Sequence, residues 1–396
     1  MREIAEGKAQ LPPSQARRHH FVPAFALARF AQPPGSRKGW IHQLDVRSGA
    51  PERTRPEDAA FVKDLYTYED RQGEQSRTVE SFFSIVEKHA APALGRLCED
   101  PSAISPQDRL SIAFFLAFQE SRTPDGLIRT ERMRQATFEL KASMGLSSLE
   151  VFRKEFDCDA TQAMSVDELE SMRKRMQNQL LEGKVGYESP RTGAMAQILK
   201  VASEIAEEIV SLDWILLSAE GAEFVTSDRP ISMVDHAPEH PWSGNAWKSS
   251  AEAISFYPMS PTKGLFMTAG DHGLSVATSD RLQVRHLNLM TYGWAERFIY
   301  GRSQEVVSKV RRQARDHPRD VVKPRPPKQV LLLPPDALSS SVTSEYARRG
   351  WPSAIPVADK DGKTGEMGYI VVDFDEPAGA VAKLGTEIAQ ALRQQD

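Results

Sequence analysis

Residues 17–25 read Arg17-Arg18-His19-His20-Phe21-Val22-Pro23-Ala24-Phe25, so two arginines and two histidines stand directly before an apolar segment. Proline is favoured in the first turn of a helix, and Pro23 therefore predicts a short helix over residues 24–30. Successive side chains of a strand point to opposite faces, so His19 and His20 cannot easily bind one metal ion together. One of them is expected to be buried in a hydrogen bond and the other to be free for chemistry. The alternative is that both are structural caps of the helix.

Outward from this stretch, hydrophobic periodicity separates a helical block from a set of short strands. Helices are predicted at 78–98, 105–122, 126–144, 147–156, 166–182, 193–211, 284–296 and 303–315. Strands are predicted at 40–46, 61–68, 254–257, 265–268 and 298–300, with a hairpin formed by 214–217 and 223–226. The fold class that follows is α+β, a mainly helical block packed on a small, mostly antiparallel sheet.

A proline-rich stretch, residues 323–328, reads Lys-Pro-Arg-Pro-Pro-Lys and is extended and semi-rigid by composition. It predicts four parts along the chain. Residues 1–16 are a flexible tail, 17–322 form the main α+β domain, 323–328 are the linker, and 329–396 form a small α/β extension. The extension could dock a protein partner.

The composition is that of a globular protein, with 40% hydrophobic and 26% charged residues in a chain of 396. A net charge of -4 argues against a broad basic surface for nucleic acid or membranes. Local basic clusters such as 311–315 leave a local basic groove open, although a solvated helix face or a linker is the simpler explanation. Cys98 and Cys158 form no CxxC pair, which predicts a reducing compartment without disulfides. With no signal peptide in residues 1–15 and no apolar run of membrane-spanning length, we expect a soluble cytoplasmic protein.

Formal matches to metal-binding motifs fail on physical grounds. The sequence His236-Ala237-Pro238-Glu239-His240 fits a zinc protease pattern that needs both histidines on one helical face. Pro238 obstructs that helix. Residues 359–362 begin like a calcium loop but lack the full set of oxygen ligands, so a hairpin turn is expected there. The chain contains no phosphate-binding P-loop and no dinucleotide fingerprint.

Several segments, in the right order, resemble a bacterial family known as domain of unknown function 4238. They are His19-His20-Phe21-Val22-Pro23, Asp64-Leu65-Tyr66-Thr67, Glu87, Phe118-Gln119-Glu120-Ser121-Arg122-Thr123-Pro124, Phe224-Val225-Thr226-Ser227-Asp228-Arg229-Pro230-Ile231, Tyr257-Pro258-Met259-Ser260-Pro261 and Leu287-Asn288. Each is weak alone, but together they are specific and cover roughly 17 to 301. Ala24 departs from the family pattern, in which a polar Gln is usual. The resemblance implies which residues matter, and it implies no activity.

Glu87 shares a helix face with apolar side chains, and a buried carboxylate is costly unless it is paired or bound to metal. Gln119 and Arg122 continue an apolar stripe on the next helix, so an ion pair between Glu87 and Arg122 is the structural alternative. Asp228 follows a predicted strand, where an acidic residue can bind metal, orient a base or make ordinary turn hydrogen bonds. Asn288 could position a substrate or satisfy backbone groups.

This assortment suits hydrolysis of a phosphodiester by a divalent metal ion, with nucleic acid or a nucleotide as substrate. The predicted catalytic residues are His19, His20, Glu87, Gln119, Arg122 and Asp228. Substrate binding is assigned to Arg18, Arg229 and Asn288, and the ligands of Mg²⁺ or Mn²⁺ to Glu87 and Asp228. Such an enzyme could be a toxin or an anti-phage effector.

Two other classes of function stay open. A non-catalytic module could bind an anionic small molecule or a nucleic acid end through Arg18, His19, Arg122 and Arg229. Alternatively, the protein is a structural interaction protein whose motif residues only lock helix to sheet. Substitution of His19 or Asp228 by alanine would distinguish this last class, because architectural residues lower the melting temperature strongly when removed.

Overall fold

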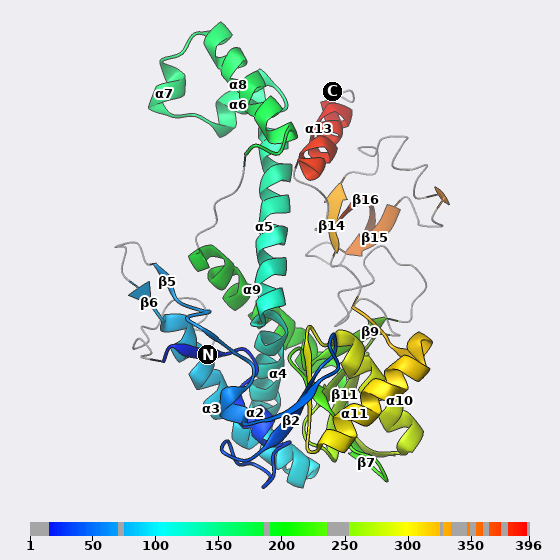
Figure 1. Cartoon of the computed structure of the whole chain (residues 1–396). Helices are drawn as coiled ribbons and strands as arrows, with labels where there is room; N and C mark the ends of the chain where they lie inside the picture. Colours follow the sequence, from blue (N-terminus) through cyan, green and yellow to red (C-terminus); the bar gives the residue numbers. More distant parts are fainter. Residues whose placement is uncertain are drawn as a thin grey trace. The chain divides into compact units, whose positions relative to one another are not determined.

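A computed structural model describes residues 16–69, 75–185, 191–235, 253–324, 328–333, 347–348, 354–358, 364–373 and 379–393. The chain divides into two compact units (Figure 1). The first comprises Met1–Thr130, Pro190–Ala237 and Ser243–Arg325, and the second comprises Glu131–Ser189, Pro238–Trp242 and Pro326–Asp396. One boundary falls in the predicted proline-rich linker. However, residues 131–189 group with the C-terminal segment, whereas the sequence placed them in the main domain.

The first unit opens with short strands around the sequence that carries the two histidines. Strand β1 (Arg18–His20) pairs antiparallel with β4 (Phe61–Lys63), with His19 opposite Val62. Pro23 precedes helix α2 (Ala24–Ala28), which ends two residues before the predicted end at residue 30. The remaining elements before residue 77 are β2 (Ile41–Asp45), β3 (Pro51–Thr54), η1 (Pro56–Asp58), β5 (Tyr68–Glu69) and β6 (Gln75–Ser76). The predicted strand 61–68 is therefore two short strands separated by a turn.

Three long helices form the core of this unit: α3 (Thr78–Glu99), α4 (Pro106–Ser121) and α9 (Arg191–Ser211). Helix α4 begins at a capping box in which Ser105 and Asp108 exchange hydrogen bonds, with Pro106 at the first helical position. All residues from Ser111 to Gln119 are buried, so α4 is surrounded by its neighbours. Aromatic side chains of α3 and α4 pack together, with Phe82 and Phe118 rings 5.0 Å apart. Helix α4 is thus the central element on which the motif residues are placed.

Two sheets complete the first unit. The five-stranded sheet has the order β12-β7-β11-β10-β9 and is antiparallel except for the parallel pair β12–β7. Its strands are β7 (Asp213–Ala219), β9 (Ser232–Asp235), β10 (Ala253–Pro258), β11 (Lys263–Thr268) and β12 (Leu274–Ser279). The four-stranded sheet has the order β3-β2-β13-β8, in which β8 is Thr226–Ser227 and β13 is Phe298–Gly301. Helix α10 (Arg281–Trp294) lies between β12 and β13 in the chain. Helix α11 (Gln304–Asp316) follows β13, and the short η3 (Pro318–Asp320) follows α11.

One sequence prediction about the sheets is wrong. Residues 214–217 and 223–226 do not form a hairpin, because β7 pairs with β11 and β12, while β8 pairs with β13 in the other sheet. The physical reason lies in Asn288 of α10. Its side chain accepts a hydrogen bond from the N–H of Val225 at 2.9 Å and donates one to the carbonyl of Glu223 at 2.8 Å. These backbone groups are therefore satisfied by a helix side chain instead of a partner strand.

The short η2 (Pro101–Ala103) belongs to the first unit. Helix α5 (Pro124–Gly145) crosses the division after Thr130, and most of it lies in the second unit. The second unit also contains α6 (Leu149–Glu155), α7 (Asp159–Gln162), α8 (Val166–Leu181), the antiparallel sheet β14-β16-β15 and α13 (Ala380–Arg393). The three strands are β14 (Lys328–Leu333), β15 (Ala354–Ala358) and β16 (Thr364–Asp373). A small core joins Leu146, Phe152, Leu169 and Leu180 to Ala382 of α13.

The α+β fold class is confirmed, with helices predominating and small, mainly antiparallel sheets. No helix in the described part of the chain is long and apolar enough to cross a membrane. The tail through residue 15, the motif at 236–240 and residues 359–362 lie outside the described residues.

Candidate functional site

His19 is fully buried, and both of its ring nitrogens are engaged. Its Nδ1 accepts a hydrogen bond from the N–H of Tyr66 at 2.9 Å, so Nε2 carries the proton and donates to the carbonyl of Ala16 at 3.0 Å. The ring stacks on that of Tyr66, with centroids 5.4 Å apart. Burial lowers the pKa of His19 below its usual value, which keeps the imidazole neutral. His19 therefore fixes the 16–20 segment to the turn before β5.

His20 and Arg18 lie on the other face of β1. The Nε2 of His20 donates to the carbonyl of Glu57 at 3.1 Å, and burial lowers the pKa of this half-buried ring. Arg18 bonds the same carbonyl at 2.9 Å and the Asp58 carboxylate at 2.9 Å. The side chain of Arg18 is 49% exposed, so it is the most accessible of the predicted anion-binding residues.

Arg122, at the C-terminal end of α4, is the centre of a buried polar network. Its guanidinium donates to the Glu87 carboxylate at 2.9 Å and to the backbone carbonyl of His20. The Arg122 carbonyl accepts from the hydroxyl of Tyr66 at 2.7 Å, and the guanidinium lies 4.6 Å from the centre of the Phe83 ring. Burial opposes the charge, but neighbouring acidic groups nevertheless raise the pKa of Arg122. The ion pair expected between Glu87 and Arg122 is present and joins α3 to α4.

Glu80 belongs to the same network and was not among the predicted residues. It lies seven residues before Glu87, so the two carboxyl groups share one face of α3. Burial, together with the charge of Glu87, raises the pKa of Glu80 to about 7, although Arg122 acts in the opposite direction. The Oε2 atom of Glu80 is buried and has no hydrogen-bond partner among the residues that the structure describes. We call Tyr66, Glu80, Glu87 and Arg122 the Arg122 network.

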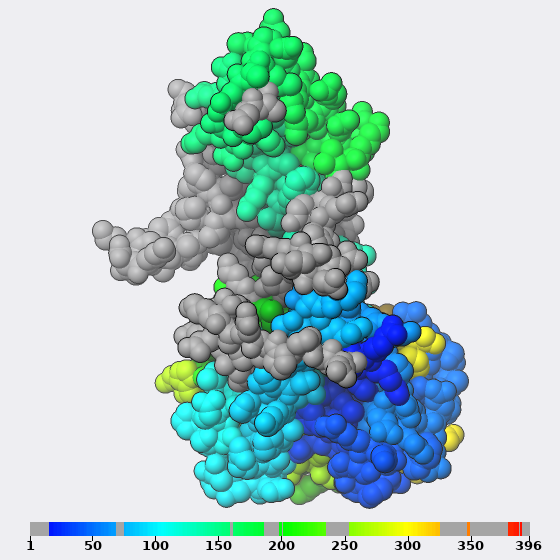
Figure 2. Space-filling view, turned by 90° about the vertical axis from the view of Figure 1, so that its left-hand side faces the viewer, coloured from blue at the N-terminus to red at the C-terminus, as the bar shows by residue number. Residues whose placement is uncertain are grey.

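Gln119 ties the opening sequence to α4 one turn earlier. Its amide nitrogen donates to the carbonyl of Phe21 at 2.7 Å. Figure 2 shows the N-terminal residues, in blue, lying beside the surface of α3 and α4, in light blue to cyan. The Oε1 of Gln119 and the Nε of Arg122 are buried without a partner in the described part of the chain. Buried polar atoms are normally bonded, and such exceptions are characteristic of functional or water-binding positions.

Asp228 accepts backbone hydrogen bonds, which is the structural role that the sequence left open beside metal binding and orientation of a base. Its Oδ1 accepts from the N–H of Glu296 at 2.9 Å, and its Oδ2 accepts from the N–H groups of Arg297 and Phe298, each at 2.8 Å. Burial raises the pKa of Asp228 to about 6 even though these three bonds favour the charged form. The carboxylate is thus engaged on both oxygens and fixes the chain where it enters β13.

Arg229 takes part in a second buried network on the other side of the same helix end. It contacts Glu120 at 3.3 Å and Asp125 at 3.5 Å, and its guanidinium lies 4.5 Å from the centre of the Trp294 ring. Arg129 bonds the same Glu120 oxygen at 2.8 Å. Burial and the neighbouring Arg129 lower the pKa of Arg229. This arginine is paired and only 5% exposed, so it does not present a free cation to a ligand.

Glu296 stands between these groups and is another residue that the sequence did not indicate. Burial and the carboxyls of Asp228 and Asp125 raise its pKa to about 7. Its Oε1 is buried and lacks a partner among the described residues, and its backbone N–H donates to Asp228. Asn288, by contrast, is committed to the backbone of Glu223 and Val225.

The predicted residues therefore meet in two groups around the segment from Gln119 to Asp125. His19, His20, Gln119 and Glu87 surround Arg122, directly or through one residue. Asp228 and Arg229 belong to the second network, and Arg18 and Asn288 to neither. Among the described residues, no group of three or more His, Cys, Asp or Glu side chains is arranged to hold a metal ion. The divalent ion expected with Glu87 and Asp228 stays a prediction.

A model of the family named Protein of unknown function (DUF4238) matches residues 18–305. The chain belongs to the DUF4238 family. The match begins at the strand carrying His19 and ends within α11, so it includes both buried networks and all nine predicted site residues. No curated protein and no solved structure matches the chain. Family membership thus supports the choice of residues and assigns them no activity.

The sequence contained a signal for Glu80 that could have been used. A second acidic residue two helical turns before Glu87 must lie on the same buried face, where a carboxyl is expected to be perturbed. Glu296 gave no such signal, because its pKa is raised by burial and by Asp228 and Asp125, which are far away along the chain. Contacts of that kind appear only once the fold is known.

Proposed function

We propose that this member of the DUF4238 family is a hydrolase that acts by general acid–base catalysis at the Arg122 network, with a phosphodiester as substrate. One observation carries the proposal. The carboxyl of Glu80 combines a pKa of about 7 with a buried oxygen that has no partner, beside the ion pair of Glu87 and Arg122. A group whose pKa lies near the working pH is well suited to give and take protons.

The neighbouring groups fit supporting roles. Glu87 is held by Arg122, so two carboxyls with different surroundings share one face of α3, a pattern typical of acid–base pairs. The Nε of Arg122 has no partner in the described part of the chain, so this donor could stabilise negative charge that develops on a phosphoryl oxygen. The side chain of Glu87 is 24% exposed, so this end of the network is open to solvent.

A divalent ion remains part of the proposal in a modified form. Mg²⁺ and Mn²⁺ prefer oxygen ligands, and Glu80 and Glu87 are the carboxyls in this network that could supply them. Asp228 is less suited than the sequence suggested, because three backbone N–H groups already occupy its two oxygens.

The experiment is to incubate the purified protein with RNA, DNA and nucleotides, with and without Mg²⁺, Mn²⁺ or Zn²⁺. We expect turnover whose rate changes with pH around 7 and falls by roughly 100-fold or more in Glu80→Gln, the range typical of a lost acid–base group. Glu87→Gln should also abolish turnover. Glu99→Gln, at the exposed end of the same helix, is the matched control and should retain full activity.

Two outcomes would count against the hydrolase. One is the absence of turnover under every metal condition with a folded protein, and the other is turnover that Glu80→Gln leaves unchanged. Saturable binding of an intact substrate without cleavage would instead favour the alternative that the protein is a non-catalytic module for an anionic ligand.

A further inference from the structure

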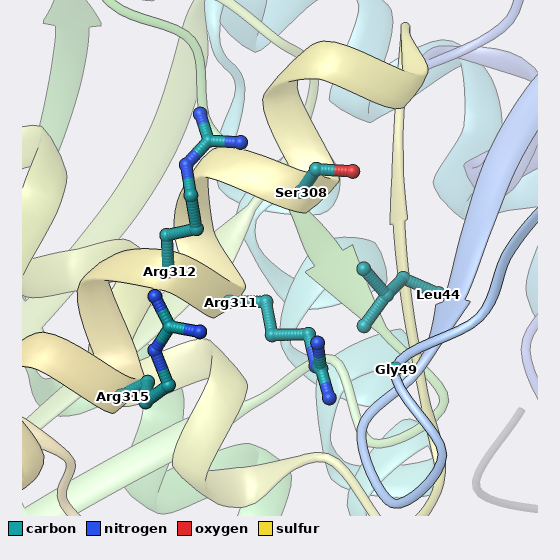
Figure 3. A pocket seen from close by; sticks show the side chains of 6 residues that line it. All are labelled: Leu44, Gly49, Ser308, Arg311, Arg312 and Arg315. Carbon is teal, nitrogen blue, oxygen red and sulfur yellow. The ribbon is translucent and has the colours of Figure 1, made fainter.

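A small cavity of about 170 Å³ lies between helix α11 and the turn that joins β2 to β3. It is lined by Leu44, Gly49, Ser308, Arg311, Arg312 and Arg315. Figure 3 shows the guanidinium of Arg311 extending toward the turn at Gly49, while the other polar side chains project from the same helix. Three cationic side chains thus border one small space in the first unit.

The amphipathic pattern of α11 brings these residues together. Val307, Val310 and Ala314 are buried, and the first two pack with Leu44, Val225 and Ile299 of the four-stranded sheet. Residues at spacings of three and four share a helix face, so Ser308, Arg311, Arg312 and Arg315 form one polar face beside the hairpin. The basic cluster that the sequence suggested to be a plain solvated face therefore borders a cavity.

Arg311 is held in place by the turn. Gly49 has a φ of +75°, and a Cβ atom at this position would lie 1.8 Å from the guanidinium carbon of Arg311. The absence of a side chain lets the guanidinium lie directly against the backbone. It donates to the carbonyl of Ser48 at 3.5 Å and bonds the hydroxyl of Tyr292. These partners are neutral, so they position the cation without cancelling its charge.

The other two arginines are little neutralised. Arg312 is exposed and makes no ion pair or hydrogen bond with a described residue. Within the described residues, Arg315 pairs with the carboxylate of the adjacent Asp316 alone, at 3.3 Å, and both side chains are more than half exposed. Surface pairs of this kind contribute little. Three arginine side chains therefore line the cavity, and the one carboxylate paired with them, that of Asp316, is exposed.

We propose that this cavity binds the phosphate group of a small ligand. Guanidinium groups present planar sets of donors that match phosphate oxygens, and the hydroxyl of Ser308 adds a neutral donor. The volume is below the roughly 300 Å³ at which pockets begin to enclose whole drug-sized molecules, which fits one charged group. No aromatic side chain lines the cavity, so it offers no platform for stacking a base. This site is separate from the Arg122 network and does not depend on hydrolysis.

Calorimetric titration of the full-length protein in chloride buffer tests the proposal. The probes are inorganic phosphate, AMP and, as a singly charged comparison, acetate. We expect one phosphate-bearing ligand per chain, and roughly 10- to 100-fold weaker binding in Arg312→Gln and in Arg311→Gln, as for a lost charge-assisted hydrogen bond. Lys309→Gln is the matched control, because it removes one positive charge from the same helix outside the cavity.

Tighter binding of AMP than of phosphate would support a site for the terminal phosphate of a larger molecule, and equal binding would support a site for the free ion. The proposal is overturned if neither probe binds saturably, if acetate binds as tightly as phosphate, or if Lys309→Gln weakens binding as much as Arg312→Gln. Because Arg312 is exposed and unpaired, its substitution is not expected to disturb folding.

Discussion

At the scale of single residues, the family motif serves mainly to satisfy buried polar groups. His19, Gln119 and Asp228 each bond the backbone of a segment that is distant in sequence, namely Tyr66, Phe21 and residues 296–298. Glu80 differs from them because its carboxyl combines a pKa of about 7 with an oxygen that has no partner in the described part of the chain. A buried carboxyl that titrates near neutral pH is a better candidate for chemistry than a side chain that bonds the backbone of a distant segment.

The dependence of stability on pH should reveal the state of Glu80. Burial raises its pKa from 4.5 to about 7, so the folded state favours the protonated form. The protonated Glu80 carboxyl therefore stabilises the folded state fully below the unfolded-state pKa, and this contribution is lost as pH rises through 7. Glu80→Gln cannot ionise, so its free energy of unfolding relative to wild type should increase between pH 4.5 and 7, by at most about 3 kcal/mol.

Chemical denaturation of wild type, Glu80→Gln and the exposed control Glu99→Gln at a series of pH values measures this difference. The control should follow wild type throughout. A constant offset between Glu80→Gln and wild type over the whole range would show that the folded protein does not perturb the carboxyl.

Removal of Asp228 should be costly for a structural reason. Asp228→Ala leaves three buried N–H donors without an acceptor, and each such group costs roughly 1 to 3 kcal/mol. We expect a loss of about 3 kcal/mol or more, which lowers the melting temperature by at least ~6 °C in a domain of this size. Asp271→Ala, at an exposed position, should change it by less than about 2 °C.

Thermal unfolding followed by circular dichroism compares the two aspartate variants. A melting temperature for Asp228→Ala equal to that of Asp271→Ala would contradict the architectural role. If the protein also hydrolyses a substrate, the residual activity of folded Asp228→Ala separates a loss of stability from a loss of catalysis.

At the scale of elements, helix patterns were the most predictable part of the fold. Helix α4 carries its own start signal in Ser105, Pro106 and Asp108, and its end is marked by Thr123-Pro124, so its bounds follow from local chemistry. The residues 223–226 lack such a local determinant. Their apolar alternation fits a hairpin strand, but the side chain of Asn288 takes their hydrogen bonds from 63 residues away.

The candidate site likewise contains features that could be predicted from the sequence and features that depend on distant contacts. The pair Glu87–Arg122 was foreseeable, since a carboxylate and an arginine on two apolar helix faces need each other. The cavity beside α11 was not, because it requires the turn at Gly49 to approach Arg311 over more than 260 residues of sequence. A sequence shows the charge pattern of a helix but not the element that will lie opposite it.

At the scale of the whole molecule, the second unit is discontinuous in sequence. The division falls inside helix α5 after Thr130, where no glycine, proline or change of composition marks a boundary. The sequence therefore indicated the linker near 323–328 but not the association of residues 131–189 with the C-terminal segment. That association depends on contacts of α13, whose Ala382 is buried beside Leu146 and Leu180.

Helix α13 should consequently stabilise the helices α6 and α8. Gly385 lies so close to α5 that a Cβ atom there would be 1.9 Å from the hydroxyl of Ser143. Gly385→Val should displace α13 and expose the apolar cluster around Phe152 and Leu169, because interiors tolerate little overlap. Hydrogen exchange should then accelerate in α6 and α8 while α3 and α4 keep their protection. The exposed Lys383→Val is the matched control and should leave all four helices unchanged. Equal acceleration in α3 and α4 would mean that the two units unfold as one, and unchanged exchange in α6 and α8 would mean that α13 is not needed for their stability.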